Sequence, residues 1–288
     1  MRRKALWHSA PFKKWDELYS LDVRWQMPVV LWASTNIAER VGLWRTCNWL
    51  RHLGIDGDNV LILEFEPTPS LGPPQEPLPP FDCRWSVPDY DDEALLTRFA
   101  AAQPWPQLRF TKAARLWEQY VDANPSRLAK SCTQGIEGFA ELPQVWTFMS
   151  AFFPRRNADG KLRLSRFDEM LLRLLSDQPS TPLQVYAHDS DLGVELRHWL
   201  SVTGDLFLDW RLTQWAQHRG AFVKRAPGPN PQLPLQKWTY LLTDAGRQLC
   251  NAGLGYLPNA PPLTIGGTDA YTLHSPWVLL DTGQLAEV

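Results

Sequence analysis

The sequence lacks the motifs by which catalytic and metal-binding proteins are commonly identified. Its four cysteines, Cys47, Cys83, Cys132 and Cys250, are far apart, with no CxxC motif and no cysteine–histidine pair at metal-ligand spacing. HExxH, GxGxxG, GxSxG and Walker lysine motifs are absent as well. We therefore expect isolated thiols, no metal site and no cofactor, assign no catalytic residue, and lean away from an enzyme.

Long apolar segments are also missing. No run approaches the roughly 18 consecutive apolar residues of a membrane-spanning helix, and the densest patch is the short TFMSAFF around Phe148. The first residues, MRRKALWHSAPFKKW, carry the charge of a signal peptide without its apolar stretch. We expect a cytoplasmic protein that does not enter a membrane.

Positive charge is nowhere concentrated. The chain has 29 lysines and arginines against 31 acidic residues, a net charge of −2. The largest local imbalance is acidic: residues 61–104 carry 2 basic and 8 acidic side chains, whereas residues 1–60 carry 9 and 6. Modules that bind nucleic acid need a basic field to neutralise phosphates, so this distribution disfavours avid binding of DNA or RNA.

An α/β unit stands out near the start of the chain. Residues 28–33 (PVVLWA) and 60–65 (VLILEF) are short apolar runs rich in strand formers. Between them, apolar residues recur at helical spacing from Ile37 to Leu50. A strand–helix–strand order with two apolar strands predicts parallel pairing, and we assign residues 1–66 to an α/β domain.

The next two segments differ in composition. Seven of the fourteen residues in the stretch 67–80 are proline, which predicts an extended connector over residues 67–90. Residues 91–160 then show two apolar stripes at helical spacing. We assign them to a helical middle segment that ends at Gly160.

Residues 161–288 follow the order of a winged-helix domain. Helix start signals at Ser165 and Thr181 precede a third predicted helix at 205–218. Residues 221–242 then predict a β-hairpin with a turn-rich loop, and a short helix closes the order. We expect a mainly α, winged-helix-like C-terminal domain after the α/β N-terminal domain, and hence an α+β protein.

Several stretches read in order VVLWAS, RVGLWRTCNWL, LWEQYVDANPSRL, ELPQVWTFMSAFFPRRNADGKLRLSRFDEMLLRLL, GDLFLDWRLTQW, LLTDAGRQL and IGGTDAYTLHSPWVLLD. Together they cover most of residues 28–282, and they resemble a bacterial family of uncharacterised proteins, a domain of unknown function. The family has no established activity. The resemblance therefore implies an α/β unit followed by a winged-helix-like part, and it implies no catalytic residue.

The third helix and the wing form a possible partner or DNA surface. At about 100° per residue, Leu208, Leu212 and Trp215 share the core face, which leaves an exposed Leu206/Trp210 pair on the opposite side. Recognition of guanine and phosphate normally requires Arg or Lys on that side. The predicted surface consists of Leu206, Trp210, Arg211, Thr213, Gln214 and Gln217 from the helix and Lys224, Arg225 and Lys237 from the wing.

A second candidate lies where the first strand meets its helix. Ligands of parallel sheets bind at the carboxyl ends of strands, next to helix N-termini. In a simpler interpretation, Ser34 or Asn36 caps the helix and Glu39–Arg40 form a solvated ion pair. The possible ligand edge consists of Ser34, Thr35, Asn36, Glu39 and Arg40.

The leading hypothesis is a non-enzymatic regulatory or adaptor protein that uses its winged-helix-like domain for contacts with an unidentified protein partner. A first alternative is a transcription-related DNA-binding protein that acts through helix 205–218 and wing 221–242. A second alternative is a small-molecule or nucleotide-binding enzyme at the Ser34–Asn36 edge.

Overall fold

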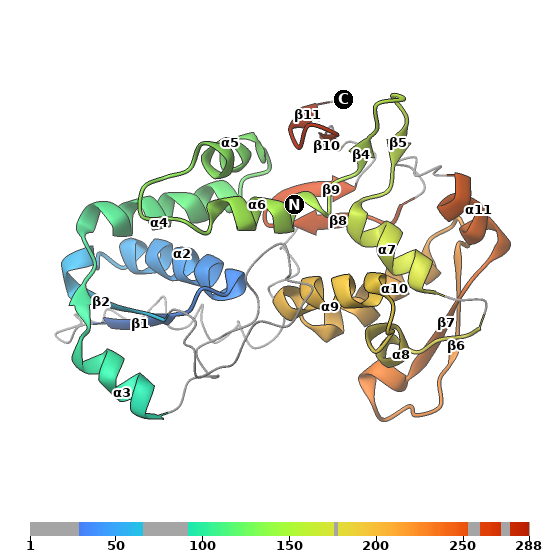
Figure 1. Ribbon diagram of the computed structural model, residues 1–288, viewed down its shortest axis with the longest axis horizontal. Coiled ribbons are helices and arrows are strands. Elements are labelled where there is room, and N and C mark those ends of the chain that lie inside the picture. Colours follow the sequence, from blue (N-terminus) through green and yellow to red (C-terminus); the bar gives the residue numbers. More distant parts are fainter. Residues whose placement is uncertain (1–28, 66–91, 176–177, 253–259, 272–276, 288) are drawn as a thin grey trace. The chain divides into compact units, whose positions relative to one another are not determined.

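The computed structural model describes residues 29–65, 92–175, 178–252, 260–271 and 277–287 (Figure 1). The predicted connector 67–90 lies outside these residues. The chain is of the α+β class, as expected, and the domain boundaries derived from the sequence stay predictions. Two compact units are distinguished: unit 1 comprises residues 1–78, 82–144 and 266–268, and unit 2 comprises residues 79–81, 145–265 and 269–288.

Unit 1 contains a three-stranded sheet in the order β1-β2-β3. Strand β1 pairs in parallel with β2, with Val29 opposite Val60, and β3 pairs antiparallel to β2. The parallel pair confirms the strand–helix–strand unit predicted from the apolar runs. The elements are β1 (Val29–Ala33), α2 (Ile37–His52), a 3-10 turn η2 (Gly57–Asn59), β2 (Val60–Glu64) and β3 (Gln103–Pro104).

Helices cover both faces of this sheet. Helices α2 and α4 (Gln107–Tyr120) pack together on one side, and α3 (Asp92–Ala100) lies on the other (Figure 1). On the α3 side, Trp32 stacks on Phe65 and on Phe99, with ring centroids 5.8 and 6.1 Å apart. Because strand side chains alternate, the Glu64 carboxylate faces the opposite side, toward α2 and α4. Two further helices of the middle segment are α5 (Ser126–Gln134) and α6 (Leu142–Ser150).

Between residue 161 and the hairpin, the described part of the chain contains four helices, one more than the sequence predicted. The predicted caps are present: Ser165 Oγ accepts a hydrogen bond from Asp168 N, and Thr181 and Gln184 form a capping box. Ser190 caps the additional helix by accepting from the Gly193 amide. The helices are α7 (Arg166–Leu174), α8 (Pro182–Tyr186), α9 (Asp191–Thr203) and α10 (Asp205–Gln217). None of the helices in the described part of the chain has the length and apolar character that crossing a bilayer requires.

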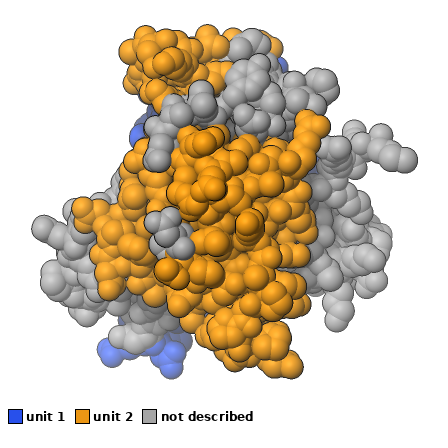
Figure 2. Space-filling model, turned by 90° about the vertical axis from the view of Figure 1, so that its right-hand side faces the viewer, with its two compact units in different colours: residues 1–78, 82–144, 266–268 blue, residues 79–81, 145–265, 269–288 orange. Residues whose placement is uncertain are grey.

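The hairpin of unit 2 consists of β6 (Val223–Pro227) and β7 (Trp238–Leu242), and helix α11 (Asp244–Ala252) follows. Its long loop contains a 3-10 turn, η5 (Pro234–Gln236), that packs against α10. Tyr240 of β7 also pairs with Ser180, just before α8. Figure 2 shows one face of unit 2 in orange.

Smaller strands complete the described chain. A four-stranded sheet has the order β11-β10-β4-β5, and β8 and β9 form a separate pair around Gly266, which adopts a φ of 60°. The strands are β4 (Arg155–Arg156), β5 (Leu162–Arg163), β8 (Leu263–Ile265), β9 (Thr268–Tyr271), β10 (Trp277–Leu280) and β11 (Leu285–Glu287).

A buried ion pair lies in the core of unit 2. Asp168 of α7 and Arg211 of α10 are both fully buried, and Arg211 donates from Nε to Oδ1 at 2.8 Å and from Nη2 to Oδ2 at 2.6 Å. Trp215 Nε1 donates to the same carboxylate at 2.9 Å. Arg211 Nη1 donates to the carbonyl oxygens of Pro261 and Pro262, both at 3.1 Å. The pair therefore joins α7, α10 and residues 261–262.

Replacing Asp168 by Asn is expected to lower the free energy of unfolding by about 3–5 kcal/mol, because it leaves a buried guanidinium without its counter-charge. Urea denaturation measures this loss. The matched control is Glu195→Gln, since Glu195 accepts the same two-pronged contact from Arg166 at a half-exposed site. The control is expected to cost about 1 kcal/mol or less. An equal loss of unfolding free energy in the two variants would contradict the conclusion that burial makes the Asp168–Arg211 pair more important than the exposed pair.

Candidate functional site

The predicted ligand edge of unit 1 is largely used to cap helix α2. Asn36 Oδ1 accepts from Ala38 N at 2.9 Å, and Asn36 N donates to Ser34 Oγ at 3.1 Å. Ser34 N donates to Glu39 Oε2 at 2.8 Å. Ser34 and Asn36 are buried, and Thr35 and Glu39 are half-buried. The capping interpretation is thus confirmed for Asn36, and the chain's own oxygens occupy the positive end of the helix.

The fifth residue of this edge, Arg40, takes part in a different arrangement. Arg40 is almost completely buried, and its Nη1 donates to Glu64 Oε1 at 2.6 Å rather than to Glu39. Arg109 of α4 binds the same carboxylate with two prongs, from Nη1 to Oε2 at 2.9 Å and from Nη2 to Oε1 at 2.7 Å. Two guanidinium groups therefore hold one carboxylate at the carboxyl end of β2.

Arg109 is held in place from several directions. Its Nε donates to the carbonyl oxygen of Gly138 at 3.2 Å. Its guanidinium lies over the Trp105 ring, 5.0 Å from the centroid, and 5.9 Å from the centroid of Phe139. These contacts restrict the rotamers of a long side chain and orient its remaining donors.

A second carboxyl group, Glu141, lies within range of these charges and accepts from Trp44 Nε1 at 3.2 Å. Burial raises the pKa of Glu141, and the nearby Arg40, the bond from Trp44 and the charge of Arg109 only partly oppose this effect. For Glu64, burial would also raise the pKa, but the hydrogen bonds from Arg109 and Arg40 outweigh it and hold the pKa below its ordinary value. We call Arg40, Glu64, Arg109 and Glu141 the strand-edge cluster.

Only Arg40 of this cluster was predicted from the sequence. Glu64 could have been found, because an acidic residue that ends an apolar parallel strand stands at the edge where ligands bind. Arg109 lies 45 residues further along the chain, in a different helix, and no local pattern connects it to Glu64. Glu141 is equally remote in sequence.

The predicted surface on α10 is only partly at the surface. Leu206 is 61% exposed, and Trp210 is half-buried, with its ring centroid 5.3 Å from that of Phe207. Gln214 is half-buried and Gln217 is exposed.

The placement of Arg211 on a partner or DNA surface is wrong, since its side chain is fully buried against Asp168. Thr213 is half-buried beside β7: Tyr240 Oη donates to Asp209 at 2.9 Å and so accepts from Thr213 Oγ1 at 2.8 Å. The hydroxyl of Thr213 therefore serves the contact with the hairpin.

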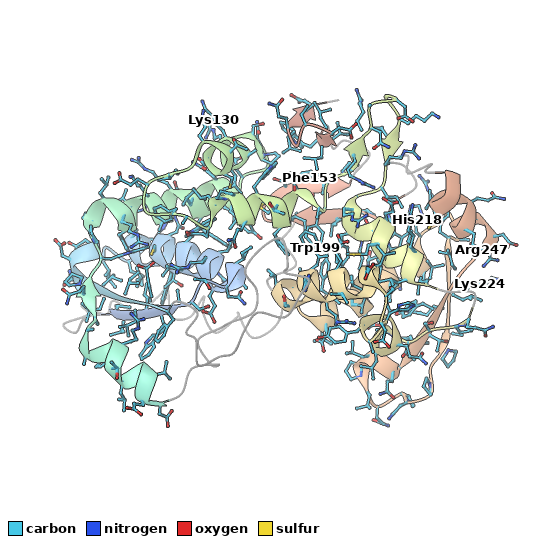
Figure 3. All side chains as sticks on the ribbon, in the orientation of Figure 1. Lys130, Phe153, Trp199, His218, Lys224 and Arg247 are labelled. Carbon is cyan, nitrogen blue, oxygen red and sulfur yellow. The ribbon has the colours of Figure 1, made fainter. Side chains whose placement is uncertain are left out.

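The three cationic residues predicted for the wing are exposed. Lys224 belongs to β6 (Figure 3). Arg225 belongs to the same strand, and Lys237 directly precedes β7. Arg225 lies 4.3 Å and Lys237 5.7 Å from the centroid of the Trp238 ring. The Trp238 ring thus makes cation–π contacts with two of these three side chains.

Comparison of the chain with protein-family models, with curated proteins and with solved structures gives no match. In the described part of the chain, no group of three or more His, Cys, Asp or Glu side chains is arranged to hold a metal ion. Cys47, Cys132 and Cys250 are free thiols, whereas Cys83 lies outside the described residues. The candidate sites therefore have to be judged from their own geometry.

Replacing Glu64 by Gln is expected to lower the free energy of unfolding at pH 7 by about 1–3 kcal/mol, because two guanidinium groups lose their anionic acceptor. The control Glu118→Gln removes a more exposed partner of Arg51 and is expected to cost about 0.5 kcal/mol or less. Since the pKa of Glu64 is lowered in the folded state, its contribution is present above the ordinary carboxyl pKa and disappears as the pH falls through the lowered value. Urea denaturation at several pH values should show the difference between wild type and Glu64→Gln shrink in acid. A difference that grows in acid would contradict this assignment.

Proposed function

We propose that this chain is a cytoplasmic regulatory or adaptor protein without catalytic activity, and that it binds a protein partner through helix α10 of unit 2. The observation that carries the proposal is the contrast on α10 between an exposed Leu206 and a buried Arg211. Arg211 is the only basic residue of this helix. The solvent side of α10 therefore presents apolar and amide groups with the acidic Asp205 and Asp209, which suits a protein surface.

Neighbouring elements add further exposed apolar side chains. Helix α8 and turn η5 both pack against α10 and against each other. Exposed apolar residues of this kind mark interaction surfaces when they gather on contacting elements. The proposed docking surface consists of Leu183 and Tyr186 of α8, Leu206 and Trp210 of α10, and Leu233 beside η5.

A winged-helix interpretation of this part is consistent with the proposal. It is supported by the order of α7, α8 and α10 before the hairpin, and by the bridge between Ser180 and Tyr240. Helix α9 is an addition to that order. In this interpretation, α10 corresponds to the helix that DNA-binding relatives of the fold would place in the major groove, but its exposed side lacks the cations for that role.

The test compares two exposed leucines in equivalent helical positions. Leu206 is the second residue of α10 and Leu108, 67% exposed, is the second residue of α4. Leu206→Asp and Leu108→Asp both place a carboxylate near a helix N-terminus, where it does not disfavour folding. We expect Leu206→Asp to reduce recovery of a specific co-purifying protein from the native cells at least tenfold, as measured by quantitative mass spectrometry. Leu108→Asp is expected to leave it unchanged.

Cross-linking through a photoreactive residue at position 206 identifies the partner directly, and position 108 again serves as the control. A discrete product formed only from position 206 supports the proposal. The same set of co-purifying proteins with wild type and Leu206→Asp would overturn it. So would a product that contains only a second copy of this chain.

DNA binding is the second candidate, because Lys224, Arg225 and Lys237 are exposed on the hairpin. Three phosphate contacts would give a salt dependence of about −2.7 in log K against log salt concentration. Under our proposal, fluorescence polarisation with a random-sequence duplex should show a Kd of about 10⁻⁵ M or weaker at physiological salt. Nanomolar binding that is lost in Lys224→Glu/Arg225→Glu and kept in the control Lys130→Glu would instead establish the DNA-binding alternative.

A further inference from the structure

The strand-edge cluster of unit 1 contains a buried guanidinium with unused donors. Arg40 is 8% exposed and carries five N–H donors, yet it makes one hydrogen bond, from Nη1 to Glu64. Its Nε and Nη2 donate to no residue in the part of the chain that the structure describes. Neither nitrogen is among the buried side-chain atoms of the described residues that lack a partner, so both donors are open to a ligand although most of the Arg40 side chain is enclosed.

The ion pairs that connect α2 and α4 to β2 through Glu64 do not explain why Arg40 is present in addition to Arg109. Arg109 alone already occupies both oxygens of Glu64, which satisfies the carboxylate and anchors α4 to β2. Adding Arg40 costs the desolvation of a second cation and gains a single bond. Glu64 therefore does not account for the remaining donors of Arg40 among the described residues, and a second oxyanion would match them.

Two guanidinium groups and two carboxyl groups meet in the strand-edge cluster. Arg40 and Arg109 supply two positive charges, and Glu64 neutralises one of them. Burial raises the pKa of Glu141, which is the second carboxyl group within range of the two guanidinium groups. The N-terminus of α2 is already capped by Asn36, which leaves the guanidinium donors as the available contacts.

We propose that the carboxyl edge of β1 and β2 binds the carboxylate or phosphoryl group of a small molecule through Arg40 and Arg109, with Glu141 beside it. The planar fork of a guanidinium matches both kinds of oxyanion. Trp105, Phe139 and Gly138 O keep Arg109 oriented in advance of binding. This site belongs to unit 1 and does not depend on the docking surface proposed for unit 2.

The experiment measures binding of inorganic phosphate and of malonate to the full chain by isothermal titration calorimetry, at constant ionic strength set with sodium chloride. We expect saturable binding of at least one probe, and the preferred probe tells a phosphoryl ligand from a carboxylate ligand. Arg40→Lys keeps the charge but loses the fork, and is expected to weaken binding at least tenfold. Arg51→Lys, on the same helix but paired with Glu118, is the matched control and should bind within twofold of wild type.

Glu141→Gln separates ligand binding from a structural role, because it removes a negative charge next to the anion. We expect it to strengthen binding two- to tenfold, whereas a variant that merely loosened the fold would weaken it. The melting temperature of each variant is recorded to verify folding. The proposal is overturned if neither probe binds saturably, if Arg40→Lys binds within twofold of wild type, or if Arg51→Lys loses as much affinity as Arg40→Lys.

Discussion

The buried pair of Asp168 and Arg211 determines which side of α10 unit 2 can present to other molecules. Desolvating two charges is tolerable only when the pair is closely matched and fully hydrogen-bonded, and both conditions hold here. Once Arg211 points inward, the helical period turns Leu206 to the opposite side and leaves it exposed. One polar contact in the core thus leaves the outer face of the helix without a basic side chain, and the proposal of a protein partner depends on this.

Two buried arginines, Arg211 and Arg40, differ in how many of their guanidinium donors have an acceptor among the described residues. Arg211 donates hydrogen bonds to the Asp168 carboxylate and to two backbone carbonyl oxygens, so its charge is balanced by groups of the chain itself. Among the described residues, Arg40 has one acceptor, Glu64, which it shares with Arg109. Burial alone therefore does not mark a binding site. In our proposal, the Arg40 donors that have no acceptor among the described residues are the ones that contact the ligand.

The sequence predicted what local rules control. The caps at Ser165 and Thr181 and the parallel strand pair depend on neighbouring residues or on short apolar runs, and they were identified correctly. The cap of α2, Asn36, was one of the two candidates that the sequence offered. Arg211 was misplaced because its position lies at the margin of the core face, where a long side chain can turn either way. Its partner Asp168 stands 43 residues earlier, beyond the reach of any local pattern. The strand-edge cluster was largely missed for the same reason, since contacts between remote elements leave no local signal.

The charges around α10 also separate a protein partner from DNA. A DNA duplex would make favourable phosphate contacts with the hairpin residues Lys224, Arg225 and Lys237. The same duplex would be repelled by the acidic Asp205 and Asp209 of α10. Like charges that face each other across an interface cost several kcal/mol, and a polyanion cannot avoid them by repacking. A protein partner with an apolar centre and an acidic rim could instead place its apolar side chains on Leu206 and its carboxylates near the hairpin. Under the proposed function, the docking surface and the hairpin contribute to the same recognition event, with affinity from the docking surface and orientation from the hairpin.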